Sequence, residues 1–199
     1  MGATASPTDQ DARAPAGTWR IDPVHSSVAF EVKHLMMSTI RGHFAEFEGE
    51  IVTDGEPSRA TARATCRAAS VDTGNALRDA ALRGADFFDA GRFPVMSLET
   101  THVETVVGRT YRVGVRLTIR GRTLEREVEA TVEGFGPDPW GAMRAGIAIR
   151  GEIDRTDFGL LFNQVLGPAG PQPVRGGSVS GALIGEKVGV RIDVSAVLE

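Results

Sequence analysis

The strongest constraint on the fold is a regular alternation of apolar with small or charged residues, which is clearest in the segment "HSSVAFEVKH". In this segment, which runs from His25 to His34, Val28, Phe30 and Val32 occupy every second position. Successive side chains of a β-strand point to opposite faces of a sheet, so the segment predicts a strand with one apolar face. His34 shares that face and His25 has the opposite parity, so the two imidazoles are not expected to be chemical partners.

The same period of two recurs along most of the chain. Seven further segments show it, and they are residues 41–51, 60–68, 95–103, 111–119, 124–132, 144–153 and 188–194. Short connections between such segments predict antiparallel pairing. About eight long strands are most simply accommodated by closure into a barrel, because closure removes exposed sheet edges. The predicted fold class is therefore all-β, an extended eight-stranded antiparallel β-barrel.

Two connections in this pattern have recognisable chemistry. The segment "IRGRT", residues 119–123, predicts a tight hairpin between two strands. The segment "GFGPDPWG", residues 134–141, is so rich in Gly and Pro that it predicts a loop. Residues 1–17 lack periodicity and predict a flexible leader, so the barrel domain is expected to span residues 18–199.

One segment departs from the period of two and predicts an inserted α-helix that caps one end of the barrel. Four of its residues recur at the spacing of a helical stripe, and they are Leu77, Ala81, Gly84 and Phe88. Thr73 or Asn75 is available as the N-cap, and Gly91 and Pro94 are expected to end the segment.

Charge and cysteine content exclude several classes of function. The formal net charge of -4 gives no basic footprint for nucleic acid. No apolar run approaches the roughly 20 residues of a membrane-spanning helix, so no integral membrane association is expected. A single cysteine, Cys66, cannot form an internal disulfide, and the leader has no apolar signal-peptide core. We therefore expect a cytoplasmic location.

The predicted interior of the barrel contains an unusual row of small side chains. One face of the third predicted strand carries Ala60, Ala62, Ala64, Cys66 and Ala68. Compact barrels fill their interior by alternating large and small side chains, so an unbroken small row predicts an apolar cavity. The neighbouring side chains are also apolar, and they are Phe30, Tyr111, Leu117, Ile147 and Ile149. The alternative is that the Phe and Tyr rings lean across and fill the space.

Six segments of the sequence together resemble the YceI-like family. In chain order they are "WRIDPVHSSVAFEVKHL", "GHFAEFEGEI", "ASVDTGNALRDAALRGADFFDAGRFP", "LTIRGRT", "DPWGAMRAG" and "RTDFGL". The combination of "VDT", "LRD", "DFFD" and "FP" around one helix is a specific pattern. The resemblance implies a lipocalin-like barrel with a capping helix, a long pore that holds a polyisoprenoid chain, and often a homodimer. The Gly- and Pro-rich stretch from Gly167 to Gly177 departs from the compact connection of the family, and it is either a lid or mobile.

The candidate ligand-binding residues combine the predicted inner face with the ends of the pore. They are Phe30, His34, Phe44, Ala62, Ala64, Arg78, Leu82, Phe87, Phe88, Phe93, Leu117, Ile119, Ile147, Ile149, Phe158 and Leu160. His34 is the candidate for a headgroup contact at the pore mouth, and the alternative is a neutral core imidazole. Arg78 could bind an anionic headgroup, although a tie to neighbouring loops is the simpler role.

Three functions remain open at this point. The preferred hypothesis is a non-enzymatic carrier that sequesters or transports an isoprenoid lipid, such as a quinone precursor or a polyprenyl phosphate. Burial of one isoprene unit is worth about 3–4 kcal/mol, which exceeds an exposed headgroup ion pair at about 0–1 kcal/mol. The alternatives are a lipid-processing enzyme with His34 as general base, and a stress-response interaction protein with a filled barrel. No cofactor, metal or catalytic residue is expected, because the four histidines and Cys66 lack metal-site spacing.

Overall fold

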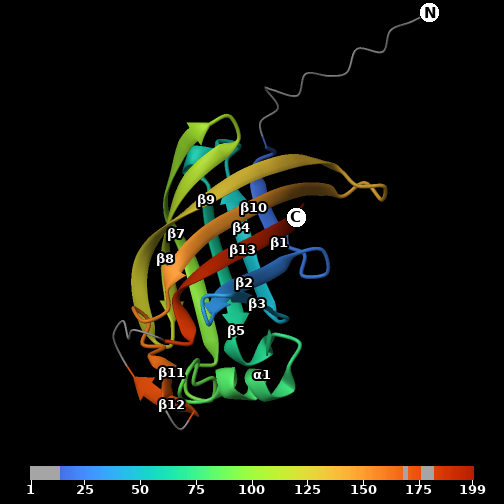
Figure 1. The fold of residues 1–199 in the computed structure, drawn as a ribbon. Helices are drawn as coiled ribbons and strands as arrows, with labels where there is room; N and C mark the ends of the chain where they lie inside the picture. Colours follow the sequence, from blue (N-terminus) through green and yellow to red (C-terminus); the bar gives the residue numbers. More distant parts are fainter. Residues whose placement is uncertain (1–13, 168–169, 176–181) are drawn as a thin grey trace, which may run out of the picture.

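The wall of the molecule is a closed ring of antiparallel strands in this computed structural model, which describes residues 14–167, 170–175 and 182–199 (Figure 1). In order around the ring, the strands are β1 (Gly17–Ile21), β4 (Phe47–Thr53), β5 (Thr61–Arg67), β7 (Val95–Val107), β8 (Thr110–Ile119), β9 (Arg122–Pro137), β10 (Met143–Asp154) and β13 (Ile184–Leu198). Pairing of β1 with β13 closes the ring. The predicted eight-stranded antiparallel barrel is confirmed. Residues 1–13 of the predicted leader lie outside the described part of the chain.

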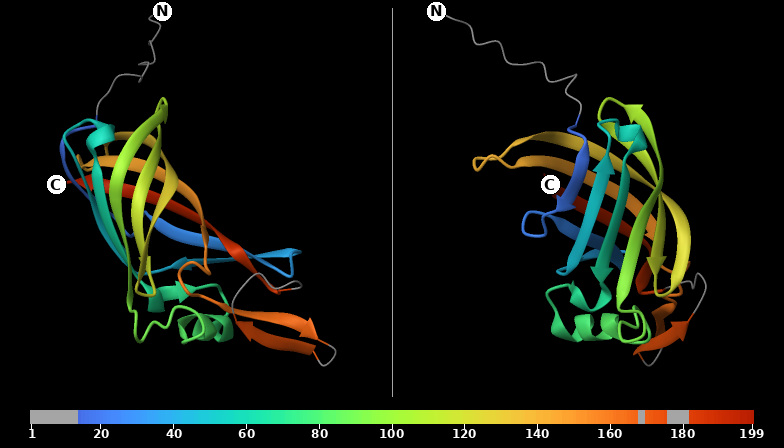
Figure 2. Two further views of the ribbon diagram at one scale, coloured as in Figure 1. Left: turned by 90° about the vertical axis from the view of Figure 1, so that its left-hand side faces the viewer. Right: turned by 180° about the vertical axis from the view of Figure 1, so that it is seen from behind.

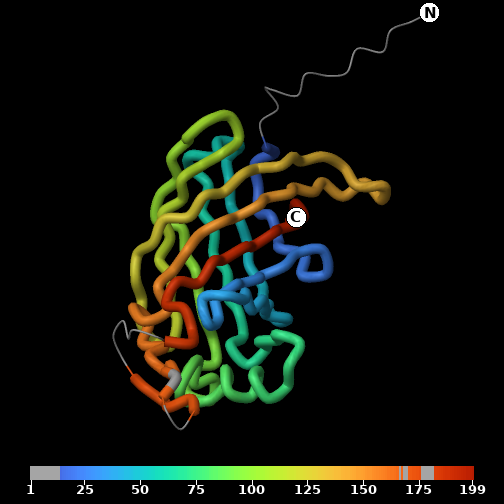
Figure 3. The backbone as a smooth tube through the Cα atoms, in the orientation of Figure 1, coloured from blue at the N-terminus to red at the C-terminus, as the bar shows by residue number. Residues whose placement is uncertain are grey.

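The ring is supplemented at one end by β2 (Ser27–His34), β3 (Ser38–Phe44) and β6 (Val71–Asp72), which continue the sheet from β13. The long strand β13 pairs with β1 near its carboxyl end and with β2 near its amino end. The chain between β1 and β2, drawn in blue, projects from the wall as a loop (Figure 3).

The predicted single strand over residues 41–51 is wrong, because the chain breaks between β3 and β4 at Ala45 and Glu46. The amide of Ala45 donates a hydrogen bond to the carbonyl of Ser70, and the amide of Glu46 donates one to Ser70 Oγ. Neither amide takes part in strand pairing. The β1–β4 ladder reaches Arg20 opposite Glu50, and the β2–β3 ladder begins at Val28 opposite Phe44. Residues 21–27 and 45–49 therefore face each other without a ladder between them. We call this region the seam.

Two predictions about connections have different outcomes. The hairpin between β8 and β9 is confirmed, and Arg120 (φ 52°) and Gly121 (φ 71°) have the positive φ values of a type I′ turn. The predicted loop over 134–141 is wrong in its first half, because β9 continues to Pro137 and Phe135 pairs with Ala145 of β10. Ladder hydrogen bonds and inward packing of Phe135 outweigh the local preference of Gly and Pro.

The inserted helix α1 (Ala76–Arg83) lies across one end of the barrel, as predicted (Figure 1). Asn75 is the N-cap, and its side chain accepts a hydrogen bond from Arg78 N at 3.0 Å. The predicted apolar stripe is wrong: Leu77 is 85% exposed, and Asp79 is buried instead. The cause is polar, because the Asp79 carboxylate accepts hydrogen bonds from Thr73 N at 3.0 Å and Thr73 Oγ1 at 2.6 Å. Neither α1 nor any other helix in the described part of the chain is long and apolar enough to cross a lipid bilayer.

A separate two-stranded sheet, β11 (Phe162–Gly167) and β12 (Gly170–Arg175), lies at the same end of the barrel as α1 (Figure 2). It docks through the rings of Phe162 and Phe87, 5.4 Å apart, and through an ion pair of Arg175 with Asp86. This hairpin is the described part of the expected Gly- and Pro-rich expansion, of which residues 168–169 and 176–177 lie outside the described residues. Two short 3-10 turns, η1 (Pro57–Arg59) and η2 (Ala68–Ser70), flank β5.

Candidate functional site

The barrel encloses a cavity of about 270 Å³. Its walls are apolar side chains from nearly every strand of the ring, together with residues from the helical end. Twelve of the residues predicted from the sequence line it, and they are Phe30, Phe44, Ala62, Ala64, Leu82, Phe87, Phe88, Leu117, Ile119, Ile149, Phe158 and Leu160. The predicted hollow interior is therefore present in the structure.

The small side chains of β5 create part of this space. Ala62, Ala64 and Cys66 all line the cavity, whereas the intervening Arg63 has an exposed side chain. On one side Ala64 pairs with Gly49 of β4, which adds no side chain, and on the other it pairs with Leu98 of β7, which also lines the cavity. Burial raises the pKa of the Cys66 thiol to about 12, so this group is an inert part of the wall rather than a nucleophile.

Packed side chains close the helical end of the cavity. The buried set there is Phe44, Ala68, Val71, Phe87, Ala90, Met96, Ile119, Phe158 and Leu160. The ring of Phe44 contacts Phe30 at a centroid distance of 5.6 Å and Phe88 at 5.5 Å, the latter edge to face. Such aromatic pairs prefer defined ring orientations, so the packed rings give this end of the cavity a defined shape.

A second cluster closes the opposite end. Its buried members are Trp19, Val194 and Ala196, and Ile51 and Phe135 pack against them. The cavity therefore lies between two packed ends. At the side it also touches Ser26, Glu48 and Glu50, which belong to or border the seam.

Four residues predicted for the site do not line the cavity: His34, Arg78, Phe93 and Ile147. His34 lies at the end of β2, where its carbonyl accepts hydrogen bonds from the turn that follows. Arg78 is tied to Thr73, with Nε donating to Oγ1 at 2.7 Å and Nη2 to the carbonyl at 2.9 Å.

The other two residues of that group have packing roles. Phe93 lies under the guanidinium of Arg92, 5.1 Å from its ring centre. Ile147 packs against the Trp19 cluster. Whether any of the four contacts a ligand stays a prediction.

Two arginines that the sequence reasoning missed line the cavity at the helical end, Arg126 of β9 and Arg155 just beyond β10. Arg126 Nη2 pairs with Asp157 Oδ2 at 2.5 Å, and its guanidinium carbon lies 5.5 Å from the Phe158 ring centre. The signal for Arg126 is its parity, because it shares the face of Leu124 and Val128 in the predicted strand.

Arg155 is a buried cation held by main-chain carbonyls. Its Nε donates to Gly185 O at 2.9 Å, and Nη1 donates to the carbonyls of Leu160 and Phe162. Nη2 donates to Ile184 O at 3.4 Å. Burial lowers the pKa of this guanidinium, and the nearby negative charges oppose that effect. Arg155 thus joins β10, β11 and β13 at the cavity floor.

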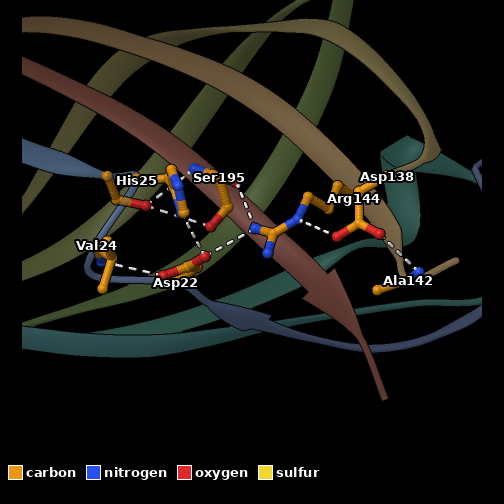
Figure 4. Close-up of polar contacts among 8 residues, drawn as sticks. Asp22, Val24, His25, Asp138, Ala142, Arg144 and Ser195 are labelled. Carbon is orange, nitrogen blue, oxygen red and sulfur yellow. Dashed lines mark hydrogen bonds and ion pairs between the residues drawn. The ribbon is translucent and has the colours of Figure 1, made fainter. Parts of the chain in front are cut away.

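A polar cluster on the outer face joins two of the segments that resemble the family (Figure 4). Arg144 donates to Asp22 Oδ2 from Nη1 at 2.7 Å and to Asp138 Oδ2 from Nε at 2.9 Å. His25 Nδ1 lies 2.8 Å from the same Asp22 oxygen. Hydrogen bonding by Arg144, and then by His25, holds the pKa of Asp22 well below its ordinary value. His25 therefore belongs to a structural clasp in the loop before β2, whereas His34 lies at the far end of that strand.

This clasp borders a groove on the outer surface. The groove has a volume of about 370 Å³ and is lined by Gly134, Gly136, Gly146 and Ser195 beside Arg144. It is open to solvent and therefore does not enclose a ligand. In the described part of the chain, no three His, Cys, Asp or Glu side chains gather closely enough to bind a metal ion. The arrangement that can bind a small molecule is the apolar cavity inside the barrel, which suits a hydrocarbon chain.

Sequence comparisons agree with this geometry. Residues 19–196 match the family described as the YceI-like domain. A Yersinia pestis protein named UPF0312 protein is 36% identical over 159 residues, which cover 78% of this chain and 81% of the relative. A UPF0312 protein of Shewanella sp. is 35% identical over 159 residues, which cover 78% of this chain and 82% of the relative.

Solved structures share the fold. Burkholderia cenocepacia BcnA superposes with a TM-score of 0.72 at 20% identity and covers 88% of this chain and 98% of its own. A polyisoprenoid binding domain from Saccharophagus degradans superposes with a TM-score of 0.64 at 17% identity, covering 92% and 99%. At these identities the likeness establishes the barrel architecture alone.

Proposed function

This chain belongs to the YceI-like domain family, and from this premise we propose that it binds a polyisoprenoid lipid inside the barrel and carries it unchanged. The observation that carries the proposal is the apolar cavity of about 270 Å³ inside the barrel. A cavity of about 150 Å³ in another protein already accepts a benzene molecule. The cavity is therefore large enough for part of a branched hydrocarbon tail.

The energetics favour an occupied cavity. Unfilled apolar space costs about 24 cal/mol per Å³, so 270 Å³ corresponds to about 6 kcal/mol. Each buried CH₂ group of a tail contributes about 0.8 kcal/mol. The twelve predicted residues that line the cavity are proposed as the tail contacts, and the structural neighbour from Saccharophagus degradans, named as a polyisoprenoid binding domain, supports this ligand class.

The carrier hypothesis is preferred over the two alternatives on specific grounds. The enzyme hypothesis uses His34 as a general base in the pore, whereas His34 is not among the cavity-lining residues. The interaction hypothesis requires a filled barrel, whereas the barrel contains a cavity. We also propose a cytoplasmic location, which the free thiol of Cys66 supports, and the homodimer that the family resemblance implies. Light scattering on the purified protein tests the dimer.

The decisive experiment is extraction of the purified protein with organic solvent, followed by mass spectrometry of the extract. We expect an isoprenoid lipid in the extract. After delipidation, we expect the protein to take up a polyprenol or a polyprenyl phosphate from solution and to return it unchanged after prolonged incubation. An empty extract together with failure to take up either lipid would overturn the proposal, and conversion of the lipid would replace the carrier with an enzyme.

A further inference from the structure

We propose that the cavity holds about two isoprene units of the lipid tail, and that the ring of Phe88 sets this limit at the helical end of the barrel. This inference rests on the proposed lipid binding and deepens it, because it names the length of hydrocarbon that the site selects. Units beyond the second lie outside the cavity and add little affinity. The protein then distinguishes short isoprenoid tails from one another by length, but not long ones.

The first step is the volume of the cavity. It measures about 270 Å³, whereas a void of about 150 Å³ in another protein holds one benzene molecule, which has six carbons. By the same measure this cavity holds about eleven carbons, and two isoprene units of five carbons each fill that space. A third unit needs room that close-packed side chains do not offer.

The second step is the packing at the two ends of the cavity. At one end Trp19 and Ala196 are buried in a cluster with apolar neighbours. At the other end the rings of Phe44 and Phe158 are buried in the cluster of the helical end. The tail therefore meets packed side chains in both directions, and a longer chain does not gain room along the barrel.

The third step is the chemistry of the lining, which favours hydrocarbon over any polar group. Arg126 pairs with Asp157, and Arg155 donates to main-chain carbonyls. Ser26 Oγ is hydrogen-bonded to the main chain of Ser195. The remaining polar residues that border the cavity occupy the outward positions of β4, β5 and β7. A hydroxyl or phosphate placed inside would lose its hydrogen bonds to water without replacement, so the polar head stays outside.

The fourth step is the position of Phe88 in the segment that follows α1. Its ring packs edge to face on Phe44, with 5.5 Å between the ring centres, and it lines the cavity. Leu82 and Phe87 of the same capping segment also line the cavity. Phe87 is engaged with the ring of Phe162 in β11. Phe88 is therefore the ring of the floor that can be removed without loosening the second sheet.

The fifth step is that the backbone of the capping segment is anchored independently of the Phe88 ring. Arg83 Nε donates to Ala69 O at 2.7 Å, and Arg120 Nη2 donates to Ala85 O at 2.8 Å. Because these bonds hold the segment in place, loss of the ring leaves space rather than a collapsed floor. The added space is comparable to that of a benzene molecule, which corresponds to about one isoprene unit.

The test measures how the affinity of the delipidated protein depends on tail length. The probes are prenol, geraniol, farnesol and geranylgeraniol, which carry one to four isoprene units and the same hydroxyl head, and they compete with radiolabelled geraniol at equilibrium. For the wild-type protein, affinity should rise about tenfold or more from one unit to two, because the second unit buries several CH₂ groups. Each later unit should change it by less than about threefold, because that unit is not buried. In Phe88→Ala the third unit should also gain about tenfold.

The matched control is Phe162→Ala, which removes a ring of the same size from behind Phe87 and outside the cavity lining. Its dependence on length should equal that of the wild-type protein, and an equal shift in this variant would overturn the role of Phe88. Urea unfolding shows whether each variant folds. If Phe88→Ala does not fold, Phe88→Leu should give a smaller gain for the third unit, and no gain would overturn that role.

Two results for the wild-type protein separate this inference from the proposed function. If affinity rises at the same rate up to four units, the limit of two units is overturned while the carrier function stands. If the protein binds none of the four alcohols and no polyprenyl phosphate, the proposed function itself fails.

Discussion

Replacement of Ala64 by Phe tests most directly whether the interior is hollow. Ala64 lines the cavity of about 270 Å³, and a void of about 150 Å³ accommodates one benzene ring. The new side chain should therefore occupy roughly half of the space. At about 24 cal/mol per Å³, filling that volume stabilises the protein by about 3 kcal/mol at most. Loss of rotamer freedom and imperfect fit reduce the expected gain to about 1–2 kcal/mol.

The same substitution should remove most of the room for a lipid tail. A tail that loses the enclosure of one isoprene unit loses about 3–4 kcal/mol, which corresponds to more than a hundredfold weaker binding. Urea unfolding of the delipidated protein measures the stability, and uptake of a polyprenol measures the affinity. Thr61→Phe is the control, because Thr61 is an exposed residue of the same strand. It should change neither quantity.

The opposite result would refute the reasoning. If the interior were already filled, the Phe ring would overpack it and destabilise the protein by about 1–3 kcal/mol. A destabilised Ala64→Phe variant with unchanged lipid binding would therefore show that the ligand lies elsewhere.

Three further predictions follow from the contacts around the cavity. Because the pKa of the Cys66 thiol is raised to about 12, little thiolate is present at pH 8. Maleimide labelling of Cys66, followed by mass spectrometry, should therefore be slow, and it should be slower still with bound lipid. Rapid labelling would contradict the burial of this side chain. In Gly42→Ala the added methyl group would lie 2.5 Å from Phe30 Cζ, so the Phe30 ring must move. Both the urea midpoint of unfolding and the lipid affinity should therefore fall. If neither value changes, the position of the Phe30 ring matters to neither stability nor binding. The depressed pKa of Asp22 means that its ion pair with Arg144 stabilises the fold above the ordinary carboxyl pKa of about 3.9 and is lost as the pH falls below it. Asp22→Asn should therefore lower the thermal midpoint at pH 7 and reduce the further loss near pH 3, and an acid response equal to that of the wild-type protein would contradict this role.

The period of two was sufficient to predict the barrel and its small-residue wall, because strand parity alone assigns Ala62, Ala64 and Cys66 to one face. Elsewhere, tertiary contacts override the preferences of the local sequence. The buried side of α1 is set by the hydrogen bonds of Asp79 with Thr73 rather than by Leu77. Strand pairing likewise extends β9 through glycines that favour a loop.

The inward arginines show a different limit of sequence reasoning. The parity of Arg126 was available in the sequence, but an arginine between apolar residues is normally assigned to solvent. Only the structure shows Asp157 and Phe158 beside it. For His34 the parity placed it on the inner face, yet parity does not tell how far a strand runs past the cavity.

The seam has a mechanical consequence for the barrel. Side chains fix its first border to β10 and β13, through Asp22 with Arg144 and Ser26 Oγ with Ser195 O. Its second border is fixed to Ser70. Across the seam, the side chain of Ile21 lies over Gly49. Ile21 also packs against the Trp19 cluster that closes one end of the barrel. Along the seam the wall is therefore held by side-chain packing in place of ladder hydrogen bonds, and this packing is continuous with that of the barrel end.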